Sequence, residues 1–327
     1  MFDFIDIHCH LSPQIIEYEM IMTNDFSHTS VLLREAVDAL NIQPNGTYID
    51  CTFGGGGHSR AILAQLGANG RLIAFDQDPQ AVAQADTIKD NRFQIYHKSF
   101  NELQKTLPHL RGQIKGILFD LGVSSPQLDQ ANRGFSFQND GDLDMRMNPT
   151  TGEPIAKWLH RAKMDEIADV LFMYGEERYS RRLARAIVQA REIEPITRTL
   201  QLAEIIKKAH PAWEKHKHPA TRSFQALRIF INQEMDVLKN VLSQTIDLLD
   251  KNGRLAAISF HSLEDRLVKR FIRDQARGSA TELDLPFLPS EHQPTLKAIG
   301  KAIYPSDDEI RQNPRARSAV LRIAEKL

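Results

Sequence analysis

The chain has 327 residues, of which 42% are hydrophobic and 25% charged, an ordinary composition for a soluble globular protein of one large or two smaller domains. Its 41 Lys and Arg against 42 Asp and Glu give a formal net charge of −1, which excludes an overall basic surface and leaves only local patches for nucleic acid. No apolar run reaches the roughly 20 residues that cross a bilayer and no secretion signal is visible, so we expect a cytoplasmic protein without membrane contact.

Residues 1–21 fit poorly with the regular pattern that follows. They contain His8 and His10 in the His-x-His spacing of some metal hydrolases, but no matching cluster of further ligands follows in the sequence, so no metal site is predicted. We expect a disordered extension, or an upstream start in front of Met22. The two cysteines, Cys9 and Cys51, cannot form a disulfide framework, which fits a reducing compartment.

A glycine-rich loop lies between a buried strand and a helix near the start of the regular part. The helical spacing of Val31–Leu40, with Ser27 or Thr29 as cap, comes first. A strand then begins at Thr47, the loop spans 50–59 (DCTFGGGGHS), and a helix follows to Leu66. Such a loop lets a ligand approach the backbone and the N–H groups of the helix. The structural alternative is a tight connection without a ligand.

Strands and helices then alternate. Buried strands are predicted over 70–76, 93–97 and 114–120, and Pro79 begins the helix after the first of them. Asp76 ends its strand 20 residues after Gly56, where a ribose diol would be held, although it could also cap the following helix. The alternation predicts an α/β protein with a parallel, doubly wound sheet.

The alternation stops at about residue 129, where we expect an inserted helical substrate-binding domain to 229. Its helices are predicted at roughly 153–161, 164–174, 176–191 and 199–209. Between Lys157 and Arg228 the sequence has 15 Lys and Arg against 9 Asp and Glu. This excess favours a phosphate-facing surface over a solvated helical surface of mixed charge. Four arginines recur at helical spacing and predict one basic face: Arg178, Arg181, Arg182 and Arg185.

The α/β pattern resumes towards the C-terminus. A long helix is expected from Ser223 to Leu249, followed by a strand over 253–260 and a helix capped by Ser262, with Asp265 in its first turn. Two last strands are predicted over 296–299 and 318–323. The sheet domain is therefore expected to be discontinuous, comprising 22–128 and 230–327.

Three ligands compete for the glycine loop. A P-loop needs a Lys-Ser/Thr pair after its glycines, whereas His58 and Ser59 follow here. A dinucleotide fingerprint is incomplete, because Ser59 stands where a third glycine is needed. S-adenosylmethionine has no phosphate, and Asp50 beside the loop would suit its ammonium group. The residues therefore favour the methyl donor, with a nicotinamide cofactor as the alternative.

Several long motifs follow one another in the chain. They are DCTFGGGGHS at 50–59, FDLGVSSPQ at 119–127, RGFSFQNDGDLDMRM at 133–147, YGEERYSRRLARAIV at 174–188, HPATRSFQALRIFINQE at 218–234, ISFHSLEDRLVKRF at 258–271 and NPRARSAVLRIAEK at 313–326. In this order they resemble the RsmH (MraW) family of bacterial 16S rRNA cytosine-N(4) methyltransferases. The resemblance covers His28 to the C-terminus and implies a class I methyltransferase fold with a doubly wound, mostly parallel seven-stranded sheet. It implies S-adenosylmethionine as cofactor and 16S rRNA or the 30S subunit as partner, with methylation of a decoding-centre cytosine, cytosine 1402.

The resemblance also implies which residues act. Asp120 is the candidate hydrogen-bond and proton acceptor for the target amine, although many amine methyltransferases have Asp/Asn-Pro-Pro-aromatic where this chain has Asp-Leu-Gly-Val. No nucleophilic cysteine is required, so Cys51 is interpreted as structural. The donor-binding positions are Gly56, Gly57, His58, Asp76, Phe100, Asp120 and Gln127.

The sequence offers several candidates for contact with the RNA. Arg315, Arg317 and Arg322 of the tail, with the inserted domain, are candidates to hold the RNA backbone. The segment where the insertion rejoins the sheet could reach the target nucleotide with His218, Arg222 and Gln225. The long helices could support a homodimer. A non-catalytic RNA-binding assembly factor and an NAD-dependent oxidoreductase stay open as alternatives.

Overall fold

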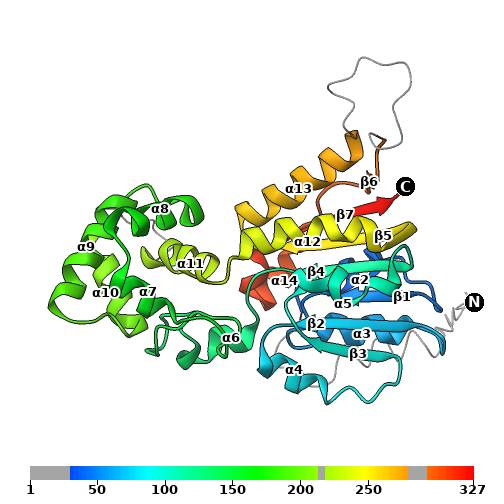
Figure 1. Ribbon diagram of the computed structural model, residues 1–327, viewed down its shortest axis with the longest axis horizontal. Helices are drawn as coiled ribbons and strands as arrows, with labels where there is room; N and C mark the ends of the chain where they lie inside the picture. Colours follow the sequence, from blue (N-terminus) through cyan, green and yellow to red (C-terminus); the bar gives the residue numbers. More distant parts are fainter. Residues whose placement is uncertain (1–29, 213–217, 279–292) are drawn as a thin grey trace, which may run out of the picture.

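The protein is described by a computed structural model over residues 30–212, 218–278 and 293–327. Its centre is a seven-stranded sheet of order β3-β2-β1-β4-β5-β7-β6 (Figure 1). The first five strands are parallel, and β7 runs antiparallel to β5 and β6. This confirms the predicted class I methyltransferase sheet. The strands are β1 (Thr47–Asp50), β2 (Arg71–Asp76), β3 (Phe93–His97), β4 (Ile114–Asp120), β5 (Leu249–Ser259), β6 (Leu296–Ala298) and β7 (Val320–Lys326).

Helices cover both faces of the sheet, which explains why its central strands are nearly continuous apolar runs. On β1, Tyr48 packs with α2 (Leu33–Ala39) and α3 (Gly57–Gln65), whereas Ile49 packs with the helices on the opposite face. Those helices are α5 (Leu103–Thr106), α12 (Glu234–Leu248) and α13 (Ser262–Arg277). Helix α4 (Pro79–Ala85) joins β2 to β3. None of the helices in the described ranges is long and apolar enough to cross a membrane.

The helices between β4 and β5 bury a hydrophobic cluster of their own, centred on residues such as Leu171, Leu183 and Leu227. They extend away from the sheet (Figure 1). The four helices predicted here are present, each within four residues of its expected bounds. They are α7 (Ile155–Arg161), α8 (Met164–Gly175), α9 (Ser180–Ile193) and α10 (Thr199–Ala209), and α11 (Ala220–Ile231) packs with them. The exact domain boundaries, 129 and 229, stay a prediction.

The single helix predicted from Ser223 to Leu249 is wrong, because α11 and α12 are separate helices. Gln233 between them has φ 52°, a left-handed conformation that ends a helix. The side chain of Asn232 stabilises this break: its Nδ2 donates to Met145 O at 2.7 Å, and its Oδ1 accepts from Met147 N at 2.8 Å. The chain therefore turns where the sheet and the extra helices meet.

Two predicted helix caps differ as well. Residues 1–29, including the proposed caps Ser27 and Thr29, lie outside the described residues, and the N-cap of α2 is Leu32, whose backbone N–H donates to Glu309 Oε1 at 2.7 Å. The N-cap of α13 is His261 rather than Ser262. At α2 the contact with Glu309 is tertiary and invisible in local sequence. At α13 the cap is local, because His261 Nδ1 accepts from Glu264 N at 3.4 Å and Glu264 Oε2 accepts from Phe260 N at 2.8 Å.

Candidate active site

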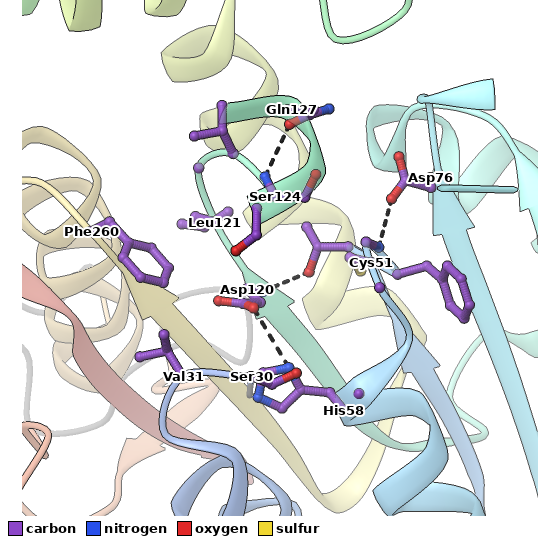
Figure 2. Close-up of a pocket in the computed structure, with 18 of the residues that line it drawn as sticks. Ser30, Val31, Cys51, His58, Asp76, Asp120, Leu121, Ser124, Gln127 and Phe260 are labelled. Atoms are coloured by element: carbon purple, nitrogen blue, oxygen red, sulfur yellow. Dashed lines mark hydrogen bonds and ion pairs between the residues drawn. The ribbon is translucent and has the colours of Figure 1, made fainter. Parts of the chain in front are cut away.

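A cavity of about 990 Å³ lies beyond the carboxyl ends of the parallel strands, where ligands bind in open α/β sheets. Figure 2 shows side chains from the ends of β1, β2, β4 and β5 directed into it. Of the seven residues predicted to bind the donor, six line this cavity: Gly57, His58, Asp76, Phe100, Asp120 and Gln127. These strand ends are far apart in sequence, so the parallel sheet is what brings the six together.

The seventh predicted residue, Gly56, does not line the cavity, whereas Gly54 and Gly55 do. Gly56 has φ 75°, and a Cβ on it would lie 2.7 Å from the ring of Phe53. It therefore shapes the turn that begins α3. At Gly57 a Cβ would collide with the Ser30 hydroxyl, so Ser30 packs directly on this loop.

Asp76 is held at the end of β2 by two backbone N–H groups. Its Oδ2 accepts from Gly54 N and its Oδ1 from Asp78 N, both at 2.8 Å. Burial raises the pKa of this carboxyl to about 6, against the lowering effect of these two hydrogen bonds. The N-cap of α4 is Asp78, not Asp76, because Asp78 Oδ1 accepts from Gln80 N at 3.0 Å. Asp76 is therefore available to a ligand.

Asp50 lies away from the ligand that the sequence predicts for it. Its side chain is fully buried and does not line the cavity. The carboxylate accepts from Ser59 Oγ at 2.7 Å and from Thr52 N at 3.1 Å, so it braces the start of α3. The prediction that it meets the ammonium group of the donor is wrong. Its negative charge nevertheless contributes to the raised pKa of both Asp76 and Asp120.

Asp120 stands at the end of β4 in the middle of the cavity (Figure 2). Its backbone N–H donates to Thr52 Oγ1 at 2.7 Å, which fixes the end of the strand. Within the described chain, its buried Oδ1 has no hydrogen-bond partner. Burial, reinforced by the charges of Asp50 and Glu264, raises the pKa of this carboxyl well above its usual value. Such a group is a stronger base than an exposed carboxylate.

His58 faces Asp120 from the first turn of α3, with Nδ1 3.6 Å from Asp120 Oδ2. Burial lowers the pKa of the imidazole to about 4, so the ring is neutral near pH 7 and forms no ion pair there. Its Nε2 is also buried without a partner among the described residues. Two buried polar atoms on facing side chains thus lack a hydrogen-bond partner among the described residues, a pattern typical of functional sites.

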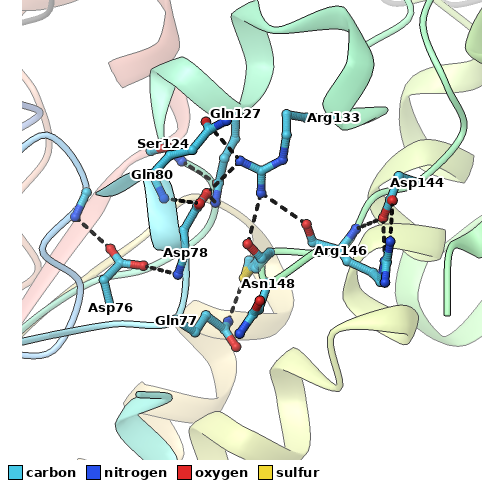
Figure 3. A network of polar contacts seen from close by, with 12 residues as sticks. Asp76, Gln77, Asp78, Gln80, Ser124, Gln127, Arg133, Asp144, Arg146 and Asn148 are labelled. Atoms are coloured by element: carbon cyan, nitrogen blue, oxygen red, sulfur yellow. Dashed lines mark hydrogen bonds and ion pairs between the residues drawn. The ribbon is translucent and has the colours of Figure 1, made fainter. Parts of the chain in front are cut away.

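A buried network supports the opposite wall of the cavity (Figure 3). Asp78 Oδ2 accepts from Gln127 Nε2 at 2.8 Å and from Arg133 Nη1 at 2.7 Å. The other end of the Arg133 guanidinium donates to the carbonyl oxygens of Arg146 and Met147, at 3.1 and 2.9 Å. Arg133 thereby links the β2–α4 connection to the segment that contacts the α11–α12 junction.

The sequence missed much of the remaining cavity wall. It comes from residues that were not singled out as ligand contacts, although several lie in the quoted motifs, and only the packing of their segments brings them together. His218, Arg222 and Gln225 do not line the cavity, and Arg322 is held by Asp265 at 2.6 Å.

Cys51 is buried and its thiol pKa is raised, as suits a structural residue. The missed residues include Ser30, Val31, Asn232, Met235, Phe260, Glu264 and Asn313, whereas Arg315, a predicted RNA contact, lies in the wall.

One group of potential metal ligands lies beside the cavity. Single ligand atoms of Glu234, His261 and Glu264 fall within 4.8 Å of one another. However, Arg228 already binds both carboxylate oxygens of Glu234, at 2.8 and 2.9 Å. The guanidinium thus supplies the positive charge that this buried cluster needs.

The cavity fits S-adenosylmethionine on three observations. The glycine loop exposes backbone to it, Asp76 offers a carboxylate at the end of the second strand, and Phe100 offers an apolar ring. The Phe100 ring is fixed by edge contact with Phe119, their centroids 5.6 Å apart. The loop is followed by His58 and Ser59 and not by the Lys-Ser/Thr pair that a triphosphate-binding loop needs.

Comparison with known proteins identifies the family. The model of the MraW methylase family matches residues 25–327. The "Ribosomal RNA small subunit methyltransferase H" of Nitrosococcus oceani is 57% identical over 92% of this chain and 97% of its own. The protein of the same name from Pseudoalteromonas atlantica is 54% identical, over 94% and 100%. A putative rRNA methylase structure from Clostridium thermocellum aligns with a TM-score of 0.43 at 13% identity, covering 92% of this chain and 100% of that one. The chain belongs to the MraW methylase family and uses S-adenosylmethionine as its methyl donor.

Proposed function

We propose that this protein methylates the exocyclic N4 amine of a cytosine in small-subunit ribosomal RNA. The names of relatives 54–57% identical support the RNA, and the family resemblance supports cytosine 1402 of the decoding centre as the target. The observation that carries the chemistry is Asp120, a half-buried carboxyl in the same cavity as the glycine loop, whose pKa is raised and whose Oδ1 has no partner among the described residues.

The donor would lie across the ends of β1, β2 and β3. The backbone at Gly54, Gly55 and Gly57 allows close approach of its methionine part. Asp76 would accept hydrogen bonds from the ribose hydroxyls, and Phe100 would pack on the adenine ring. When bound, the donor supplies an electrophilic methyl group on a sulfonium. Gln127, fixed by Asp78, would then lie at the edge between donor and target.

The acceptor is a poor nucleophile, because the lone pair of the cytosine amine is delocalised into the ring. A carboxylate that accepts a hydrogen bond from this amine favours a localised lone pair and takes the proton once the N–C bond has formed. Asp120 suits this role since its side chain lines the cavity, is 25% exposed, and has an oxygen without a competing partner among the described residues. The neutral His58 ring leaves the basicity of Asp120 intact, whereas a cation there would lower it. In-line positioning contributes the rest of the acceleration.

The RNA must present the cytosine out of its stack, because the reacting amine has to reach Asp120 inside the cavity. We propose the helices between β4 and β5 as the substrate-binding domain. Their surface carries four exposed arginines, none of which forms an ion pair with a described carboxylate. They are Arg178, Arg181, Arg182 and Arg185.

The test is the identity and position of the product. We would incubate the protein with labelled S-adenosylmethionine and either naked 16S rRNA or 30S subunits, digest the RNA, and locate the methylated nucleoside by mass spectrometry. N4-methylcytidine at position 1402 is expected, in wild type and not in Asp120→Asn. Methyl on a ring carbon or on another base would overturn the proposal. RNA binding without donor binding would favour an assembly factor, and tight NAD binding in its place an oxidoreductase.

A further inference from the structure

A second hollow, the α12–α13 groove, runs beside the active-site cavity. It has a volume of about 410 Å³ and an apolar floor with three cations among its lining side chains. The floor is made of the side chains Met235, Leu242, Leu263, Leu267 and Phe271. The cations are Lys239, Arg266 and Arg270. A groove with an apolar floor and basic side chains fits an amphipathic, anionic ligand rather than an apolar one.

Two of the three cations have no polar partner among the residues that the structure describes. Lys239 and Arg270 are exposed, and neither forms an ion pair or hydrogen bond with a described residue. By contrast, Arg273 on the same helix pairs with Asp274 at 2.7 Å, and Arg322 behind the helix pairs with Asp265. Lys239 and Arg270 come from different helices, yet they line the same groove.

The groove is continuous with the two regions that the proposed reaction needs. Met235, near the start of α12, lines both the groove and the active-site cavity. At the N-terminal end of α13, Arg266 Nη2 and Ser262 Oγ both donate to Glu176, each at 2.9 Å. Glu176 ends α8 and lies two residues before Arg178, the first residue of the predicted basic face. Basic side chains therefore lead from the inserted helices past Arg266 and along the groove.

We propose that the α12–α13 groove binds the single-stranded RNA that flanks the target cytosine. Lys239, Arg266 and Arg270 contact its phosphates, and a nucleoside next to the target packs on the apolar floor by way of Met235. This inference rests on the proposed function, because it takes RNA as the substrate. A single strand suits the site, since a flipped target base leaves its neighbours unstacked and available to an apolar surface.

The test compares two double charge reversals of equal net charge. Lys239→Glu with Arg270→Glu changes the groove. Lys269→Glu with Arg277→Glu changes two exposed cations of α13 that do not line it. Each protein is measured for donor affinity by calorimetry, and for the affinity of a short rRNA fragment carrying the target by fluorescence anisotropy at several salt concentrations. Methylation of the same fragment is measured in parallel.

The groove variant is expected to bind the fragment at least tenfold more weakly than the control variant, with donor affinity unchanged in both. The slope of log affinity against log salt should be smaller in magnitude than that of wild type by about 1.4, because each lost phosphate contact on a single strand lowers the slope by about 0.7. Equal RNA affinity of the two variants would overturn the proposal. So would a groove variant that loses only binding to 30S subunits and keeps the naked fragment, since the groove would then contact a protein.

The two proposals fail in different ways. A wild-type protein that binds the fragment but transfers no methyl group contradicts the proposed function, while the two variants still decide the groove by their affinities. A wild-type protein that methylates the fragment, with both variants equally tight, contradicts the groove alone. Circular dichroism of each variant verifies the fold before either result is read.

Discussion

The two sides of the active-site cavity differ in how completely their polar atoms are bonded. On the donor side, every carboxylate and amide atom of Asp76, Asp78 and Gln127 has a partner within the protein. On the acceptor side, Asp120 Oδ1 and His58 Nε2 are buried without one among the described residues. A bonded wall is preorganised to hold a ligand, whereas unbonded buried atoms carry a cost that a reacting group can relieve.

The largest expected effect tests the acceptor side. Asp120→Asn keeps the size of the side chain but removes its basicity. We expect the single-turnover rate at saturating donor and RNA to fall by about 10²–10⁴-fold, the usual contribution of a general base. Donor affinity, measured by calorimetry, should stay within a few-fold of wild type. A rate within threefold of wild type would mean that Asp120 does not take part in proton transfer.

The next effect tests the donor side. Arg133→Met leaves Asp78 as a buried carboxylate without its cation and removes the donor to two carbonyl oxygens. We expect a loss of about 3–5 kcal/mol in the free energy of unfolding, measured with urea. Arg198→Met is the matched control, because Arg198 also binds two carboxylates, Asp140 and Asp142, but at the surface. The free energy of unfolding of Arg198→Met should fall by about 1 kcal/mol or less.

If Arg133→Met and Arg198→Met lose equal stability, the donor-side network contributes no more to folding than a surface ion pair, which contradicts the comparison. A double variant, Arg133→Met with Asp78→Asn, tests the cause of the loss. The amide can still cap α4 and leaves no buried charge unpaired, so the double variant should be more stable than Arg133→Met alone.

The smallest effect is a pH dependence of donor binding. The pKa of Asp76 is raised to about 6 in the folded protein, so its carboxylate form is lost as pH falls through this value. Because the ionised form is the better acceptor for ribose hydroxyls, the affinity for donor should fall about tenfold between pH 7 and pH 5. The effect of this carboxyl on the stability of the fold has the opposite sign. Because its pKa is higher in the native than in the unfolded state, the native state binds the proton more tightly. Asp76 therefore stabilises the fold below about pH 4, and this stabilisation is lost as the pH rises through 6.

Calorimetry at pH 5, 6 and 7 on wild type and Asp76→Asn measures this effect. The variant should bind more weakly at pH 7 and show a flatter profile. A profile in the variant as steep as in wild type would assign the titration to another group.

Much of the donor side could be predicted from the sequence, because it follows local rules. Strands that end in Asp76 and Asp120, with a glycine loop after the first strand, must meet at one edge of a parallel sheet. The direction of Asp50 could not be predicted in the same way. A residue at a strand end can face either side of the sheet, and its bond to Ser59 turned it into the protein.

Apart from Asp120 and His58, the acceptor side could not be predicted from local sequence. Its wall combines Val31, Met235 and Phe260, which lie in separate helices and loops and read as ordinary core residues. The break at Gln233 was missed because a non-glycine residue with positive φ has no sequence signal, and here the side chain of Asn232 supports it. Long-range packing, rather than propensity, decides these features.

The most direct test of the central claim is the pH profile of the methyl-transfer rate under single turnover, for wild type and Asp120→Asn. If Asp120 takes the proton from the amine, the wild-type rate should rise with pH through a pKa well above the usual value of an aspartate. The variant should be slow and lack this inflection. The same inflection in both proteins would contradict the account, because the titrating group would then be one other than Asp120.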